Sequence, residues 1–147
     1  MKIKKLTEHI GAEISDIRID SLEQSEVDEI KEAWLAHKVL VFRNQPISVE
    51  AHIAFGKHFG ELEIHPFADN LDDYPEIIVL EAGGDSPRQN YNAAQDWHID
   101  VSFREKPPMG SILRGKSIPE HGGDTHFANA AAAYERLDSN LKSRVED

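Results

Sequence analysis

The stretch WHIDVSF, residues Trp97 to Phe103, is the part of this sequence from which fold and chemistry are inferred most directly. Its aromatic and β-branched residues favour a β-strand. Side chains on a strand alternate between the two faces, so His98 and Asp100 should lie side by side. An imidazole nitrogen and a carboxylate oxygen on one face would supply two ligands of a 2-His-1-carboxylate iron site.

The His-x-Asp spacing alone is weak evidence for a metal site. With 8 histidines and 27 acidic residues among 147, about one or two such pairs arise by chance. A histidine that is only salt-bridged or capped on a strand is therefore the simpler interpretation of His98. The position of the pair adds weight to the metal site, because a polar, glycine-containing loop at residues 83–95 precedes it.

The composition indicates one soluble domain over residues 1–147. Hydrophobic residues make up 39% of the chain and charged residues 29%, as in globular proteins. The formal net charge of -11 argues against nucleic acid and anionic membranes as partners. No apolar run reaches membrane-spanning length, and the basic N-terminus lacks the apolar region of a signal peptide. The absence of cysteine excludes disulfides and is compatible with a cytoplasmic location.

The order of predicted elements indicates an α+β domain built around a β-sandwich or barrel. Ser25 is the predicted N-cap of a helix over residues 25–37, because apolar residues recur at helical spacing from Val27 to Leu35. Ser48 is the predicted N-cap of a second helix that ends near Gly60. Further helices are expected at 129–137 and from Ser139. Strands are expected at 3–6, 12–19, 39–42, 62–64, 77–80, 97–103 and from 111 to 113.

Other candidate site residues have ordinary interpretations too. His65 precedes a proline at a strand end, where it would be either a surface residue or a residue at a pocket mouth. His121 and His126 are both candidates for a third metal ligand, and spacing does not choose between them. Thr125 follows an aspartate at a turn, where simple turn chemistry also explains it.

Four segments of the sequence together resemble a known family. They are GELEIHP (60–66), EIIVL (76–80), WHIDVSF (97–103) and GGDT (122–125). They stand in the order seen in taurine dioxygenase and its relatives, the Fe(II)- and 2-oxoglutarate-dependent dioxygenases of the TauD/TfdA type. The resemblance covers nearly the whole chain. Four ordered motifs are more specific than one His-x-Asp, so they favour the metal site.

The resemblance implies a double-stranded β-helix, or jelly roll, with flanking helices, incomplete here at its C-terminal end. It implies that His98 and Asp100 are iron ligands and that Thr125 contacts the 2-oxoglutarate carboxylate nearest the metal. His65 matches the histidine that meets the sulfonate in taurine-using members, and Val101 matches a residue that lines the substrate pocket. Fe(II) is the implied cofactor and 2-oxoglutarate the co-substrate.

Two differences from the taurine enzymes concern the substrate. Ala68 and Ala94 stand where those enzymes carry a tyrosine and an asparagine. The loss of two polar contacts argues against taurine itself, because such pockets discriminate mainly through hydrogen bonds. We expect hydroxylation of a small anionic molecule, a sulfonate, alkyl sulfate or aryloxy acid, by molecular oxygen, with release of succinate and CO2. Family members also often form homo-oligomers.

The family's second iron-binding histidine and its 2-oxoglutarate-binding arginine lie in the C-terminal half, and no residue here matches either. We therefore interpret the chain as the N-terminal portion of a dioxygenase that is inactive on its own. Two alternatives stay open. One is a non-catalytic metal-binding jelly roll that uses His98, Asp100 and perhaps His126. The other is a hydrolase with a His98-Asp100 base, although no Gly-x-Ser-x-Gly motif is present.

Overall fold

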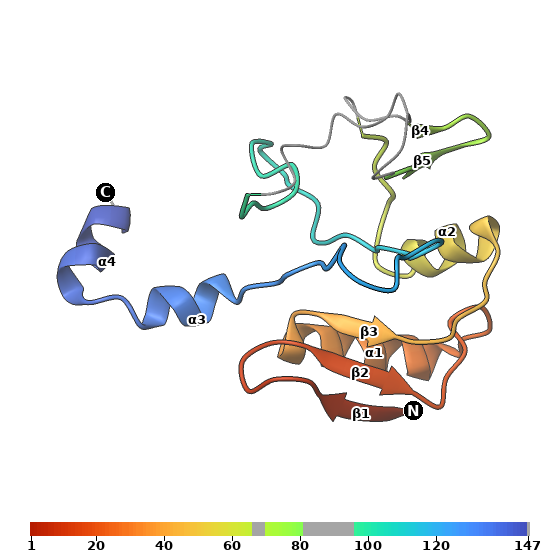
Figure 1. The fold of residues 1–147 in the computed structure, drawn as a ribbon, viewed down its shortest axis with the longest axis horizontal. Coiled ribbons are helices and arrows are strands. Elements are labelled where there is room, and N and C mark those ends of the chain that lie inside the picture. Colours follow the sequence, from red (N-terminus) through yellow and green to blue (C-terminus); the bar gives the residue numbers. More distant parts are fainter. Residues whose placement is uncertain (66–69, 81–95, 147) are drawn as a thin grey trace. The chain divides into compact units, whose positions relative to one another are not determined.

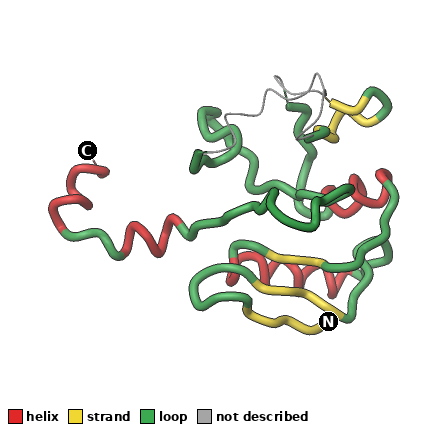
Figure 2. The backbone as a smooth tube through the Cα atoms, viewed as in Figure 1, coloured by secondary structure: helices red, strands yellow, loops and turns green. Residues whose placement is uncertain are grey.

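The computed structural model describes residues 1–65, 70–80 and 96–146. They fall into two compact units. The first consists of Met1–Ser48 with Ile118–Asp147, and the second is Val49–Ser117. Figures 1 and 2 show the elements of both units.

The first unit contains a three-stranded sheet in the order β1-β2-β3 (Figure 1). The strands are β1 (Lys2–Lys5), β2 (Ala12–Ser15) and β3 (Leu40–Phe42). β1 and β2 pair antiparallel, and β2 and β3 pair parallel. A parallel pair needs a crossover connection, and the helix α1 (Gln24–His37) supplies it. The three strands predicted before residue 43 are therefore confirmed, with β2 shorter than expected.

The core of the first unit lies where α1 packs on the three-stranded sheet, which it contacts at β3. Ile14 of β2 and Ile30 of α1 are each 1% exposed, and Val27 and Ala33 of α1 are also buried. Leu35, predicted on the same apolar side, is instead 67% exposed. At 3.6 residues per turn it lies about 140° around the helix from Ile30, so the stripe that faces the sheet excludes it.

The start of α1 differs from the prediction by two residues. Glu23, not Ser25, is the N-cap residue, and its backbone N–H donates to the Glu26 carboxylate at 2.9 Å. An acidic side chain in the first turn also interacts favourably with the helix dipole. The contact between Glu23 and Glu26 therefore places the start of the helix before Ser25.

The second unit contains α2 (Val49–Lys57) and a two-stranded antiparallel sheet of β4 (Asn70–Leu71) and β5 (Tyr74–Ile78). Figure 2 shows that most of the remaining described chain in this unit is loop. α2 begins directly after Ser48, as predicted, and ends three residues before Gly60. Phe55 is buried, and its ring packs edge-on against Phe59 with centroids 5.3 Å apart.

Two short helices follow in the first unit, α3 (Ala130–Glu135) and α4 (Ser139–Glu146). The Asn129 side chain caps α3 by accepting from the Ala132 N–H, and it also donates to the His9 carbonyl. None of the helices in the described ranges combines the length and apolar character needed to cross a membrane.

Several predicted strands are wrong. Residues 62–64, 97–103 and 111–113 are described, and none of them is a strand. Asp100 to Phe103 instead form a turn, which the Arg104 N–H closes on the Val101 carbonyl at 3.3 Å. A strand needs a hydrogen-bonded neighbour, and the described residues pair none with these segments. The mixed helix and strand content is confirmed, and the described strands form one three-stranded and one two-stranded sheet.

Candidate metal centre

His98 and Asp100 lie side by side although their segment is not a strand. His98 Nε2 is 3.2 Å from Asp100 Oδ1, and each side chain is about half exposed. The other ring nitrogen, Nδ1, donates to the Asp96 backbone carbonyl at 2.8 Å. That carbonyl can only accept, so Nδ1 carries a proton. The tautomer of a neutral ring therefore directs its Nε2 lone pair toward a carboxylate.

A lone pair facing a carboxylate is unfavourable unless a positive charge stands between them. A second proton on His98 meets this need, and so does a metal cation. The pKa of His98 is raised, chiefly by the hydrogen bond to Asp96 and further by the negative charge of Asp100, and partial burial opposes the rise. Positive charge at His98 Nε2, as a proton or a metal cation, is therefore favoured beside Asp100.

The separation of the two candidate ligand atoms is that of an ion pair and is also compatible with a shared metal ion. Nitrogen and oxygen ligands lie about 2.1 Å from a first-row divalent metal, so two of them at a right angle are about 3.0 Å apart. The observed distance of 3.2 Å between His98 Nε2 and Asp100 Oδ1 is close to this value. A histidine that bonds a carbonyl through its other nitrogen is also the usual arrangement at metal sites.

The second oxygen of Asp100 has a different partner. Ser111 Oγ donates to Asp100 Oδ2 at 2.7 Å. The two carboxylate oxygens are therefore distinguished, one facing His98 and one held by a hydroxyl. Ser111 and Asp96 were not predicted as site residues, because no fixed spacing marks a hydroxyl or a backbone carbonyl as a partner of a candidate ligand.

The residues predicted to bind substrate lie in the same unit. Arg104 Nη1 is 2.6 Å from Glu63 Oε1, and this ion pair joins the segment before His65 to the turn after Asp100. His65 is half-buried, and its carbonyl accepts from the Asn70 side chain. Val101 has φ +51°, a conformation that β-branched residues rarely adopt and that often marks functional segments. The Glu63–Arg104 ion pair was not predicted from the sequence.

Three further predicted site residues lie in the other unit. Thr125, His121 and His126 belong to the first unit, while His98 belongs to the second. In the described part of the chain, no group of three or more His, Cys, Asp or Glu residues could hold a metal ion. Ala68 and Ala94, which carried the argument against taurine, lie outside the described residues.

A family model and several curated relatives match this chain, and they agree on one family of enzymes. The family model described as "Taurine catabolism dioxygenase TauD, TfdA family" matches residues 2–147. An alkylsulfatase from Acinetobacter baylyi is 41% identical over 148 residues, covering 99% of this chain and 45% of the relative. The names of further matched relatives specify α-ketoglutarate-dependent dioxygenases of sulfonates, of sulfate esters and of 2,4-dichlorophenoxyacetate.

Solved structures agree with these matches. The crystal structure of a taurine dioxygenase from Burkholderia xenovorans matches with a TM-score of 0.80 and 37% identity, covering 98% of this chain and 50% of that one. AAD-2, solved with Mn(II) and N-oxalylglycine, matches with a TM-score of 0.77 and 29% identity over 100% of this chain and 50% of that one. The chain thus spans about half the length of the proteins that it matches.

Proposed function

The chain belongs to the TauD/TfdA family of taurine catabolism dioxygenases, and from this premise we propose that it contributes two iron ligands to an Fe(II)- and 2-oxoglutarate-dependent dioxygenase. The ligands are His98 Nε2 and Asp100 Oδ1. The observation that carries the proposal is their 3.2 Å separation, with the Nδ1 proton of His98 held by the Asp96 carbonyl. A structural neighbour that holds Mn(II) supports a divalent metal in this family.

The proposed reaction converts a substrate C–H bond, O2 and 2-oxoglutarate into an alcohol, succinate and CO2. The metal, when bound, would supply the coordination positions at which oxygen is activated and 2-oxoglutarate is held. The part of this chain is to present one nitrogen and one oxygen at a fixed separation. By the family resemblance, Thr125 contacts the 2-oxoglutarate carboxylate nearest the metal.

We assign the substrate to the small organic anions, namely sulfonates, alkyl sulfates and aryloxy acids. The names of the relatives support this class. His65 would meet the anionic group, and Val101 would line the pocket. The Glu63–Arg104 ion pair supports this assignment, because it joins the segments that carry these two residues. Ala68 and Ala94 in place of hydrogen-bonding side chains favour a substrate less polar than taurine.

The proposal includes a jelly-roll fold with residues 1–147 in one domain, as the structural neighbours support. It also includes inactivity of the 147-residue chain alone, because His98 and Asp100 supply two of the three protein ligands that the iron site needs. A hydrolase is less well supported. Both ring nitrogens of His98 face oxygens of Asp96 and Asp100, and Ser111 donates to Asp100 and not to His98.

The test is His98→Ala in the complete natural polypeptide, with His58→Ala as the matched control. His58 is an exposed histidine that follows α2 in the same unit. We expect His98→Ala to lower Fe(II) affinity and 2-oxoglutarate-dependent oxygen uptake by more than about 100-fold, beyond the usual cost of losing an outer partner. Far-UV circular dichroism should be unchanged, because His98 is half exposed.

Substrates are screened as taurine, an alkyl sulfate and an aryloxyacetate, with succinate as the measured product. We expect turnover with the alkyl sulfate or the aryloxyacetate to exceed turnover with taurine. Oxygen uptake that persists in His98→Ala, or a loss of equal size in His58→Ala, would contradict the assignment of His98 as a ligand.

A further inference from the structure

We propose that Ser111 is a positioning residue, whose hydroxyl holds the Asp100 carboxylate so that Oδ1 faces the metal. This inference rests on the function proposed above. Ser111 Oγ donates to Oδ2 at 2.7 Å, and Oδ1 is the oxygen that lies 3.2 Å from His98 Nε2. One oxygen is therefore fixed by the hydroxyl while the other remains available as a ligand.

The Ser111 hydroxyl is needed to orient Asp100, because that side chain is largely exposed to water. That side chain is 53% exposed, so water would otherwise compete for both oxygens and allow the carboxylate to rotate. A hydrogen bond from a hydroxyl to a charged carboxylate is short and about twice as strong as a neutral one. Hydrogen bonds to ligating groups orient those groups and tune the affinity for the metal.

The backbone next to Ser111 is itself anchored to α2. A side chain at Gly56 would meet Leu62 Cδ2 at 2.9 Å and Ile112 Cδ1 at 3.8 Å, so the glycine permits their close approach to the helix. His52 of α2 also makes a hydrogen bond to the backbone of Ile112. Ser111 therefore belongs to a segment that is held against a helix. These contacts restrain the backbone next to Ser111, and such restraint helps a positioning residue to hold its partner.

The test compares Ser111→Ala with Ser111→Thr and with Ser117→Ala in the complete natural polypeptide. Ser117 is an exposed serine of the same segment and serves as the matched control. Mn(II) is the probe, and its dissociation constant is measured by calorimetric titration. We expect Ser111→Ala to weaken Mn(II) binding by about 10- to 100-fold, the usual cost of losing an outer-shell partner. Ser111→Thr retains a hydroxyl at an exposed position and should restore most of the affinity.

The outcomes separate this inference from the proposed function. If the wild type and Ser117→Ala bind Mn(II) tightly, His98→Ala does not, and Ser111→Ala binds as well as Ser117→Ala, only the role of Ser111 is overturned. If the wild type binds no Mn(II), or His98→Ala binds it equally well, the metal site itself fails. A loss of affinity in Ser111→Ala that Ser111→Thr does not restore also overturns the inference, since a general packing defect would then explain it.

Discussion

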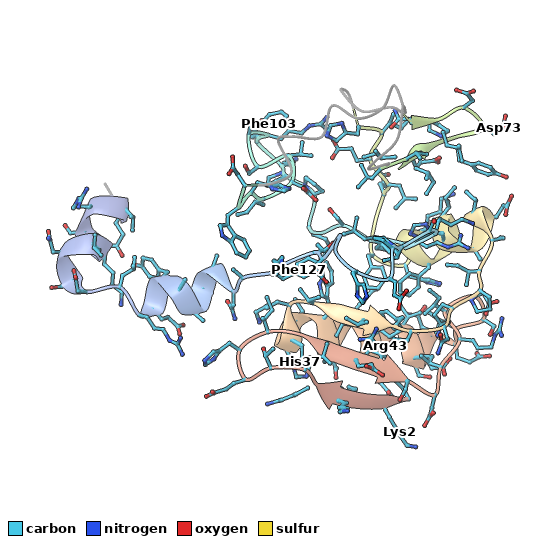
Figure 3. All side chains as sticks on the ribbon, viewed as in Figure 1. Lys2, His37, Arg43, Asp73, Phe103 and Phe127 are labelled. Carbon is cyan, nitrogen blue, oxygen red and sulfur yellow. The ribbon has the colours of Figure 1, made fainter. Side chains whose placement is uncertain are left out.

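The layer formed by α1 and the three-stranded sheet of the first unit is held in place by different means from the segment that carries His98. Ile14 and Ile30 in the layer are each 1% exposed, whereas Ile99 and Phe103 beside the candidate ligands are each 72% exposed. Phe103 is labelled in Figure 3, on the described segment that carries the candidate ligands. The layer is fixed by apolar burial. The ligand segment is fixed at a few polar points, where His98 bonds Asp96 and Ser111 bonds Asp100.

This difference shows which changes should affect folding and which should affect chemistry. Burial contributes the large stabilising free energies in proteins, while single exposed polar contacts contribute little. Substitutions in the layer should therefore be seen in the free energy of unfolding. Substitutions at the polar points should be seen first in metal affinity, as argued above for His98 and Ser111.

The largest expected effect on folding is at Ile30. Ile30→Ala should lower the free energy of unfolding by about 2–5 kcal/mol, because it leaves a cavity between α1 and the sheet. Leu35→Ala in the same helix is the control, since Leu35 is 67% exposed and its loss should change stability by no more than about 0.5 kcal/mol. Urea denaturation of both variants measures the difference. Equal effects would contradict the division between a buried and an exposed face of α1.

An intermediate effect is expected at the Glu63–Arg104 ion pair. The two side chains are 27% and 36% exposed and 2.6 Å apart, so their coupling should reach the upper part of the range for partly exposed pairs, about 1 kcal/mol. A double-mutant cycle with Glu63→Ala and Arg104→Ala, followed by urea denaturation, measures it. The coupling should decrease in high salt. A coupling of zero at low salt would show that the pair does not join these two segments in solution.

The smallest expected effect concerns pH and His52. Burial lowers the pKa of His52 below 6.5, and the positive charge of Arg114 lowers it further. Above pH 6.5 the ring is neutral in both the folded and the unfolded chain. As the pH falls below 6.5, the unfolded chain binds the proton more readily, so the free energy of unfolding decreases until the pH passes the folded pKa. His52→Gln should reduce this slope.

Urea denaturation at a series of pH values between 7 and 5 would test this linkage. His58→Gln is the matched control, because His58 is an exposed histidine just beyond the end of α2. A slope that stays the same in His52→Gln would mean that other groups produce the acid sensitivity.

Local sequence patterns predicted the first unit well. The helix predicted at 25–37 is α1 at Gln24–His37, and the strand predicted at 39–42 is β3 at Leu40–Phe42. α1 and β3 could be predicted because the apolar pattern that forms each of them lies within one short stretch of sequence. The exposure of Leu35 was missed because the apolar spacing was assessed without knowing which side of the helix the sheet would cover.

For the segment that carries His98, the proximity of the two candidate ligands was predicted correctly, but the backbone conformation was not. His98 and Asp100 were expected to lie side by side on a strand, and they do lie side by side, on a loop that leads into a turn. β-propensity shows that a segment suits an extended sheet, but pairing depends on a partner strand that local sequence does not specify. Ser111, eleven residues from Asp100, could not be identified for the same reason.

The Asn129 amide connects parts of the first unit that are far apart in sequence. Its oxygen accepts from the Ala132 N–H at the start of α3, and its nitrogen donates to the His9 carbonyl at 2.8 Å across 120 positions. At the other end of α3, Arg136 reaches the His9 ring. Closing so long a loop costs conformational entropy, so we expect these contacts to form after the local ones. We therefore expect the β1–β2 hairpin to form early, and α3 to reach its native place in the last stage of folding.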